Sequence, residues 1–245
     1  MLVAEDNPVN QRVVERLLIG RGHDVVLAAN GQEAVARYRD GVFDVVLMDV
    51  QMPVMGGFEA TAAIRAHETI VGTRVPIIAL TAHAMSGDRD RCLEAGMNGY
   101  LSKPIDRAKL FAVVEGEDDA PVAAPAATPA PPPEAETPAI DVPELLQRLG
   151  GDADLARDVV DLFRLDWPTS LARLRAALEA GDAGAVQRAA HSLKGAAGNL
   201  SAGPTTAAAR DIEHLAEARD LAAAGAELPR LEREAARLFT ALETS

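Results

Sequence analysis

The sequence has little cysteine, few aromatic residues and no long apolar run, and each shortage excludes a class of protein. One cysteine, Cys92, occurs in 245 residues, so an internal disulfide is excluded and a reducing, cytoplasmic compartment is expected. Aromatic residues make up 3% of the chain and apolar residues 48%, which favours packed helices over a β-sandwich. No apolar run reaches the roughly 18–20 residues of a membrane-spanning helix, and no secretory signal opens the chain.

Basic residues are also scarce. Lys and Arg number 24 against 37 Asp and Glu, and the net charge of −13 argues against nucleic acid as a direct partner. Residues 115–140 contain no Lys or Arg at all and carry −6, whereas residues 1–114 carry −2 and residues 141–245 carry −5. Because the same segment holds seven of the fifteen prolines and shows no periodicity, we expect a disordered, acidic Pro/Ala-rich linker between two domains.

Short apolar runs alternate with helical stretches over residues 1–114. Strands are predicted near residues 2–5, 24–29, 44–50, 76–82 and 99–103. Helices are predicted near residues 8–20, 31–39, 58–66 and 86–95, with a fifth from about 106. Five βα units in series predict an α/β domain with a doubly wound parallel sheet, whose site lies at the carboxyl ends of the strands.

Residues 141–245 change to a helical period and contain no strand pattern. Apolar faces predict helices near 145–149 and 155–163, a bend or a new start at Pro168, and further helices over 183–201, 204–218 and 220–243. Short connections between them predict an antiparallel bundle.

Reactive side chains follow the predicted strands of the first domain. The strand ends deliver Glu5 and Asp6, then Asp49, Thr81 and Lys103, and in a parallel sheet these ends share one edge. Three clustered carboxylates need a cation, and oxygen ligands suit Mg²⁺ better than zinc. A carboxylate beside a metal can attack a phosphoryl group, whose oxygens an ammonium and a hydroxyl can stabilise. The set therefore predicts an aspartyl phosphate at Asp49.

Four stretches of the first domain, "LVAEDNPVNQ", "VVLMDVQMPVM", "ALTAHAM" and "GYLSKPI", resemble the receiver domain of two-component response regulators. The resemblance implies a flavodoxin-like sheet in the order 2-1-3-4-5 and Asp49 as the phosphoacceptor. It implies Mg²⁺ bound by Asp6, Asp49 and the backbone carbonyl of Gln51, with Glu5 assisting.

The same resemblance assigns roles to the later strands. Thr81 and Lys103 would contact the phosphoryl oxygens, Lys103–Pro104 would be a cis peptide bond, and Tyr100 would be an aromatic residue that swings inward on activation. One departure is Gly56, which stands where the family usually has Asp.

A single histidine stands out in the second domain, within "AHSLKGAAGN". On a helical wheel His191 lies opposite the apolar face, so we expect it on the outside of the bundle. Its own face also carries Gly184, Gln187, Arg188, Lys194, Gly195 and Gly198. The glycines would let another protein's backbone approach, and Lys194 would add positive charge beside an incoming phosphoryl group. The alternatives are an ordinary solvated histidine and glycines that serve helix packing.

The stretch "AHSLKGAAGNL", together with "LLQRLGGD" and the spacing to "ARDIE", resembles a histidine phosphotransfer (HPt) domain over about 141–245. The resemblance implies that His191 is a second phosphoacceptor. Ser201 replaces a usual Gly, and Thr205 occupies an expected apolar position.

The two halves together predict a phosphorelay protein. Asp49 would take a phosphoryl group from an upstream histidine kinase and exchange it with His191, which would pass it to a downstream response regulator. No G-x-x-x-x-G-K-[ST] motif or other kinase ATP-binding core stands out, so we expect a phosphotransfer module. The chain begins inside a strand, as the tail of a hybrid sensor histidine kinase would, and a missing N-terminal part could tether it to a membrane.

Two other functions stay open. A module whose phosphorylation only switches partner affinity, or a phosphate sink, would be labelled at Asp49 and never at His191. A Mg²⁺-dependent aspartyl-phosphate phosphohydrolase would turn over small phosphate esters without His191, and the lack of a second acid shortly after Asp49 disfavours it.

Overall fold

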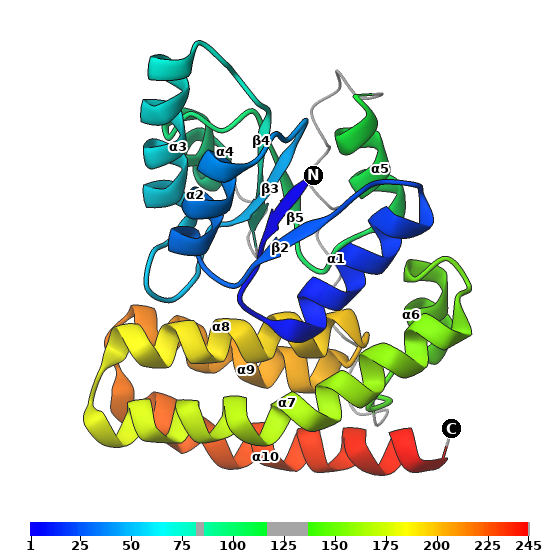
Figure 1. Cartoon of the computed structure of the whole chain (residues 1–245). Helices are drawn as coiled ribbons and strands as arrows, with labels where there is room; N and C mark the ends of the chain where they lie inside the picture. Colours follow the sequence, from blue (N-terminus) through cyan, green and yellow to red (C-terminus); the bar gives the residue numbers. More distant parts are fainter. Residues whose placement is uncertain (82–85, 117–136, 245) are drawn as a thin grey trace. The chain divides into compact units, whose positions relative to one another are not determined.

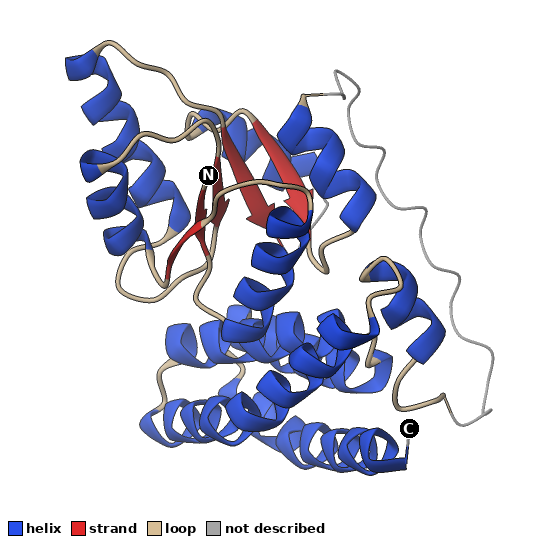
Figure 2. Cartoon of the chain, turned by 45° about the vertical axis from the view of Figure 1, so that its right-hand side comes forward, coloured by secondary structure: helices blue, strands red, loops and turns tan. Residues whose placement is uncertain are grey.

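The computed structural model describes residues 1–81, 86–116 and 137–244 and divides the chain into two compact units. The larger parts of these units are Gln11–Pro131 and Pro132–Ser245. The first unit holds five strands among helices, and the described part of the second is helical (Figure 2). Most of the expected linker, residues 117–136, lies outside the described residues, so its disorder stays a prediction.

The first unit is built on one parallel sheet in the order β2-β1-β3-β4-β5, as predicted. Its strands are β1 (Leu2–Ala4), β2 (Val26–Ala28), β3 (Val46–Asp49), β4 (Ile77–Thr81) and β5 (Gly99–Ser102). Every residue of β1, β3 and β4 is buried, which explains why these strands read as continuous apolar runs.

Helices cover both faces of this sheet (Figure 1). One face carries α1 (Pro8–Gly20) and α5 (Arg107–Glu115), and the other carries α2 (Gly31–Asp40), α3 (Gly57–Val71) and α4 (Ser86–Glu94). Two of these helices have a side-chain N-cap. The Asn30 side chain accepts from the N–H of Glu33 at the start of α2, and that of Asp106 accepts from the N–H of Lys109 at the start of α5.

Helix α3 runs five residues beyond its predicted end at residue 66, and a polar network surrounds Glu68, the buried residue of its last turn. Glu68 accepts hydrogen bonds from the Tyr38 hydroxyl at 2.7 Å and from Arg65 at 2.6 Å. Burial, followed by the hydrogen bond to Glu68, raises the pKa of Tyr38 to about 12. The sequence pattern does not show that Glu68 has partners on other elements, and the fold supplies them.

Both ends of the first unit are tied down. The N-terminal ammonium of Met1 donates to the carbonyl of Asp24 at 2.6 Å. Near the end of α1, the guanidinium of Arg21 donates twice to Glu115, the last residue of α5, at 2.6 and 3.0 Å. Strand β1 starts, and α5 ends, at the edge opposite the carboxyl ends of the strands. The start of the first unit and the end of α5 therefore both lie away from the predicted site.

The second unit contains α6 (Val142–Arg148), α7 (Ala153–Ala180), α8 (Ala183–Asn199), α9 (Gly203–Glu217) and α10 (Leu221–Thr244). The four long helices form the predicted bundle, in which α8 packs against α7 and α9, and α10 against both α9 and α7. Asp141, Asp152 and Asp182 cap the starts of α6, α7 and α8 with their side chains.

Pro168 lies inside α7, which continues through it from Ala153 to Ala180. Proline removes one helical hydrogen bond, so the helix depends here on packing. The ring of Phe163 lies 5.1 Å from that of Trp167 and 5.7 Å from that of Phe239 on α10, and these contacts hold the turn of α7 that precedes the proline against α10. Among the described residues, none of the helices combines the length and the apolar character that crossing a membrane requires.

Candidate functional site

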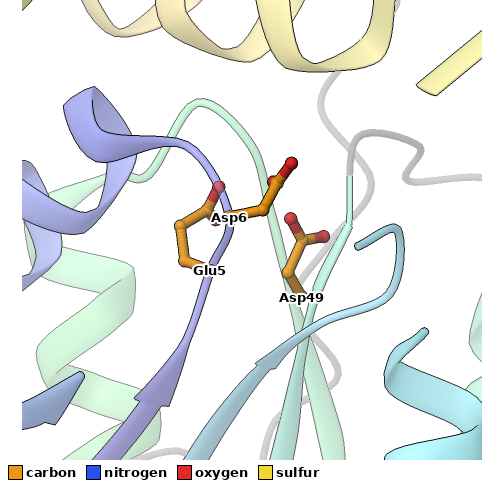
Figure 3. A group of neighbouring side chains, drawn as sticks. All are labelled: Glu5, Asp6 and Asp49. Atoms are coloured by element: carbon orange, nitrogen blue, oxygen red, sulfur yellow. The ribbon is translucent and has the colours of Figure 1, made fainter. Parts of the chain in front are cut away.

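Three carboxylates meet where β1 and β3 end. Glu5 and Asp6 follow β1 directly, and Asp49 is the last residue of β3. Each offers an oxygen, and these oxygens all lie within 4.8 Å of one another (Figure 3). Parallel pairing of β1 with β3 brings them together, since Ala4 pairs with Met48, the residue before Asp49.

Lys103 reaches this group from the end of β5. Its Nζ lies 2.6 Å from Oδ2 of Asp49 and 2.7 Å from Oε2 of Glu5. Burial opposes the charge of this ammonium, but Asp49 and Glu5 outweigh that effect and raise the pKa of Lys103. The Lys103–Pro104 peptide bond is cis, as expected from the resemblance.

The Asp49 carboxyl is engaged on both oxygens, since the N–H of Gln51 donates to Oδ1 at 3.1 Å while Lys103 holds Oδ2. Burial is the largest influence on its pKa and raises it. The charge of Lys103 opposes this, the negative charges of Glu5 and Asp6 add to it, and the pKa stands at about 8. One ammonium among three carboxylates leaves a negative site, which fits a hard divalent cation such as Mg²⁺.

The remaining predicted residues of this unit lie along the same edge. Thr81 ends β4, one residue beyond Leu80, which pairs with Asp49. Tyr100 lies on β5, half-buried against the core. Gly57, at the start of α3, allows a close approach, because a Cβ there would lie 2.2 Å from the backbone oxygen of Asp49.

His191 lies on α8 and faces a carboxylate from α9. Its Nδ1 is 2.6 Å from Oε1 of Glu213, and the ammonium of Lys194 donates to the other oxygen of the same carboxylate. Burial raises the pKa of Glu213, but its hydrogen bond with His191 and the charges of His191 and Lys194 outweigh burial, and the pKa falls to about 2. Glu213 is therefore ionised throughout the neutral range.

The helical wheel did not give His191 this partner. Glu213 of α9 reaches the face of α8 that the wheel left open, and its carboxylate contacts the His191 ring there. The Lys194 ammonium, which was expected beside an incoming phosphoryl group, donates a hydrogen bond to the Glu213 carboxylate.

Comparison with known families assigns both units. The family model of the response regulator receiver domain matches residues 1–115, and that of the Hpt domain matches residues 158–241. The chain belongs to these families as a receiver domain followed by an Hpt domain. The two resemblances read from the sequence are thereby confirmed.

The relatives include histidine kinases. The chain is 34% identical over its full length to the sensor histidine kinase GacS of Pseudomonas protegens, of which it spans 27%. It is 33% identical to the signal transduction histidine-protein kinase BarA of Escherichia coli, over 66% of the chain and 18% of the relative. The chain thus spans about a quarter or less of the curated relatives it matches.

Solved structures match the receiver half. One is the receiver domain of a Pseudomonas aeruginosa sensor histidine kinase with a magnesium ion in its active site cleft, at 50% identity and a TM-score of 0.43, covering 47% of this chain and 93% of that one. Another is the Saccharomyces cerevisiae complex of Ypd1 with the Ssk1 receiver domain, at 36% identity and a TM-score of 0.45, covering 46% of this chain and 83% of that one.

The departures from the family patterns have local consequences. Gly56 is the residue before α3 and offers it no side-chain cap, although the Glu59 carboxylate accepts from its N–H at 3.1 Å. Ser201 adopts φ +53, the left-handed region in which the usual glycine would be unstrained. The Thr205 side chain is fully buried, and its hydroxyl has no hydrogen-bond partner among the described residues.

Glu213 is the functional residue that sequence reasoning missed. The stretch "ARDIE" ends on it, and it shares the buried stripe of α9 with Ala209, Ile212 and Ala216. The sequence feature that could have identified it is a carboxylate on the apolar face of a predicted helix, since a buried carboxylate must find a partner on the facing helix.

Proposed function

We propose that this chain is a phosphorelay module in which Asp49 of the receiver domain and His191 of the Hpt domain hold the same phosphoryl group in turn. An upstream histidine kinase supplies the group, and a downstream response regulator receives it. The observation that carries the proposal is the pair of chemically complementary acceptors, a carboxylate in a cation-seeking cluster and an imidazole oriented by Glu213.

At the receiver edge, a carboxylate oxygen of Asp49 forms the new O–P bond as the donor's N–P bond breaks. Lys103 then shifts its contact from Asp49 toward the phosphoryl oxygens, and the Thr81 hydroxyl donates to another of them. Asp6, Asp49 and the carbonyl of Gln51 would hold Mg²⁺, with Glu5 assisting. When bound, Mg²⁺ supplies positive charge that stabilises the phosphoryl oxygens in the transition state.

At the Hpt domain, Glu213 fixes the tautomer of the nucleophile. Since Nδ1 carries the proton that it donates to Glu213, the lone pair lies on Nε2, which forms the N–P bond as the O–P bond at Asp49 breaks. The phosphorylated ring is an imidazolium whose Nδ1–H remains on an ionised carboxylate. Acyl phosphate and phosphoramidate are both reactive, so the exchange can run in either direction.

The wider setting belongs to the same proposal. Receiver followed by Hpt domain is the order expected at the C-terminal end of a hybrid sensor histidine kinase, and GacS and BarA carry kinase names. We place the module in the cytoplasm, where its single cysteine stays reduced.

The order of transfer can be tested with a radiolabelled small-molecule phosphodonor and Mg²⁺. Label on Asp49 is an acyl phosphate, which base removes, whereas label on His191 is a phosphoramidate, which acid removes. Asp49→Asn should abolish both signals, and His191→Gln should abolish only the acid-labile one. Acid-labile label on the Asp49→Asn chain would overturn the order.

The same experiment separates the second candidate, a receiver-switched binding module or phosphate sink. That function predicts base-labile label on the wild-type chain and no acid-labile label at any time.

A further inference from the structure

A short segment ahead of the four long helices, residues 137–149, contacts the helix that carries His191. This entry segment includes α6 and lies outside the residues that the Hpt family model matches, which start at residue 158. It is nonetheless part of the folded unit, because α6 packs against α7. Its apolar side chains are buried, namely Ile140, Leu145 and Leu149.

The entry segment reaches the end of the bundle where α8 stops and α9 starts (Figure 1). The Nη1 of Arg148 donates to the carbonyl of Gly198 at 2.6 Å, and the N–H of Asp141 donates to the carbonyl of Ser201 at 3.1 Å. A helix leaves its last carbonyls without intrahelical partners, and a cation beside them also interacts favourably with the helix dipole. Arg148 therefore stabilises the last turn of α8 from outside the matched region.

The second half of α8 needs such support. Gly195 and Gly198 both lie between His191 and the end of the helix, and glycine is among the least favourable residues inside a helix. Gly198 follows His191 by two turns, which is about 10 Å along the helix axis. Fraying that starts at the end of α8 therefore has only a short distance to travel before it reaches the phosphoacceptor.

The position of the His191 ring depends on two helices. Its Nδ1 lies 2.6 Å from Glu213 on α9, and Lys194, one turn further along α8, donates to the other oxygen of that carboxylate. A hydrogen bond of this length tolerates only a small shift of α8 relative to α9. Arg148 and Asp141 attach to the turn that joins these helices, so the entry segment fixes the register in which His191 meets Glu213.

We propose that Arg148 is a positioning residue for the phosphoacceptor. By holding the carbonyl of Gly198, it keeps α8 and α9 in the register that places Nδ1 of His191 on Glu213 and presents Nε2 to the phosphoryl group. Arg148 acts on the α8–α9 turn and not on the reacting atoms. The proposal rests on the proposed function and extends the functional Hpt unit toward the N-terminus, to the entry segment.

The test uses two full-length chains. The donor carries His191→Gln and is labelled on Asp49 with a radioactive phosphodonor and Mg²⁺; the acceptor carries Asp49→Asn and retains His191. Single-turnover transfer over a range of acceptor concentrations separates the saturating rate from the concentration at half-saturation. Arg148→Met in the acceptor keeps the aliphatic stem and removes the donors. It should lower the saturating rate about tenfold and leave half-saturation within about twofold.

A rescue variant and a matched control separate positioning from a general loss of stability. Arg148→Lys keeps a cationic donor for the Gly198 carbonyl and should restore the saturating rate to within about threefold of the parent's. Arg164→Met removes the same kind of contact elsewhere, because the guanidinium of Arg164 donates to the carbonyl of Leu242 in the last turn of α10 at 2.9 Å. This control should transfer at the parent rate.

Nitrogen NMR of acceptor chains labelled with ¹⁵N-histidine reads the ring directly. In mildly alkaline buffer, a proton that stays on Nδ1 gives two widely separated ring signals, whereas exchange of the proton between both nitrogens draws the signals together. The His191 signals are assigned by their loss in His191→Gln. They should be widely separated in the parent, in Arg148→Lys and in Arg164→Met, and closer together in Arg148→Met.

A parent rate in Arg148→Met, or a slower rate with an unchanged His191 spectrum, would overturn the proposal. Equal slowing by Arg164→Met would do the same, as would weaker half-saturation at an unchanged saturating rate. If Arg148→Met does not fold, Arg148→Gln keeps a shorter donor and should give an intermediate rate and an intermediate spectrum. Failure of the parent pair to transfer at all would instead contradict the proposed function.

Discussion

At the scale of single residues, Glu213 supplies the negative charge that His191 and Lys194 contact. One carboxylate accepts from Nδ1 of His191 and from the ammonium of Lys194, each on its own oxygen. Its pKa of about 2 is below its ordinary value near 4.5, so the charged pair stabilises the folded state above pH 4.5. That contribution is lost as the pH falls from about 4.5 toward 2.

Replacing Glu213 by Gln tests this role. The amide can still accept from Nδ1–H, but the charge is gone, and transfer from Asp49 to His191 should slow about tenfold. In urea denaturation, the variant should be less stable than the parent at neutral pH, and the difference should shrink between pH 4.5 and 2. Glu217→Gln is the matched control, because Glu217 also lies on α9 and accepts from Gln187 of α8 at 2.9 Å. A pH-independent difference, or equal slowing by the control, would contradict the role.

At the scale of elements, the sequence predicts positions along the chain better than contacts across it. Strand ends were predicted because apolar runs stop at polar residues, and Asp49 and Thr81 do end their strands. The last turn of α3 and the position of Glu213 were missed, since both depend on partners on another helix. The sequence could not decide whether Pro168 bends the helix or starts a new one, because its effect depends on aromatic packing with α10.

The turn between α8 and α9 provides a prediction at this scale. Ser201 has φ +53, and its buried hydroxyl has no hydrogen-bond partner among the described residues. Ser201→Gly relieves both costs and should stabilise the Hpt domain by about 1 kcal/mol, measured by urea denaturation.

The reverse change is available at the end of α7. Gly181 has φ +67, and a Cβ there would meet nothing within 4 Å, so Gly181→Ser tests the backbone alone. It should cost about 1 kcal/mol. A destabilised Ser201→Gly chain would mean that serine has a role in the turn.

At the scale of the whole molecule, the chain consists of two units with separate cores. The sequence indicated this through the change from alternating strands and helices to helices alone, with a proline-rich segment between. The boundaries at 114 and 141 stay predictions, since residues 117–136 are not described.

Two cores predict two unfolding transitions, and the cluster of carboxylate oxygens found among the described residues lies in the receiver domain. Millimolar Mg²⁺ should therefore raise the midpoint of one transition by a few degrees and leave the other unchanged, because a ligand stabilises only the unit that binds it. Calorimetry with and without a chelator measures this. Asp6→Asn should remove the shift, and a shift of both transitions or of neither would contradict a cation site confined to the receiver edge.

The tie between Arg21 and Glu115, and that between Met1 and Asp24, place the entrance and the exit of the receiver domain on the side away from Asp49. Whatever is fused before residue 1 or after residue 116 therefore joins at the end of the domain opposite the carboxylate cluster. Such a domain can be exchanged between proteins as a cassette, with its reactive side left clear for whichever donor or acceptor the host protein presents.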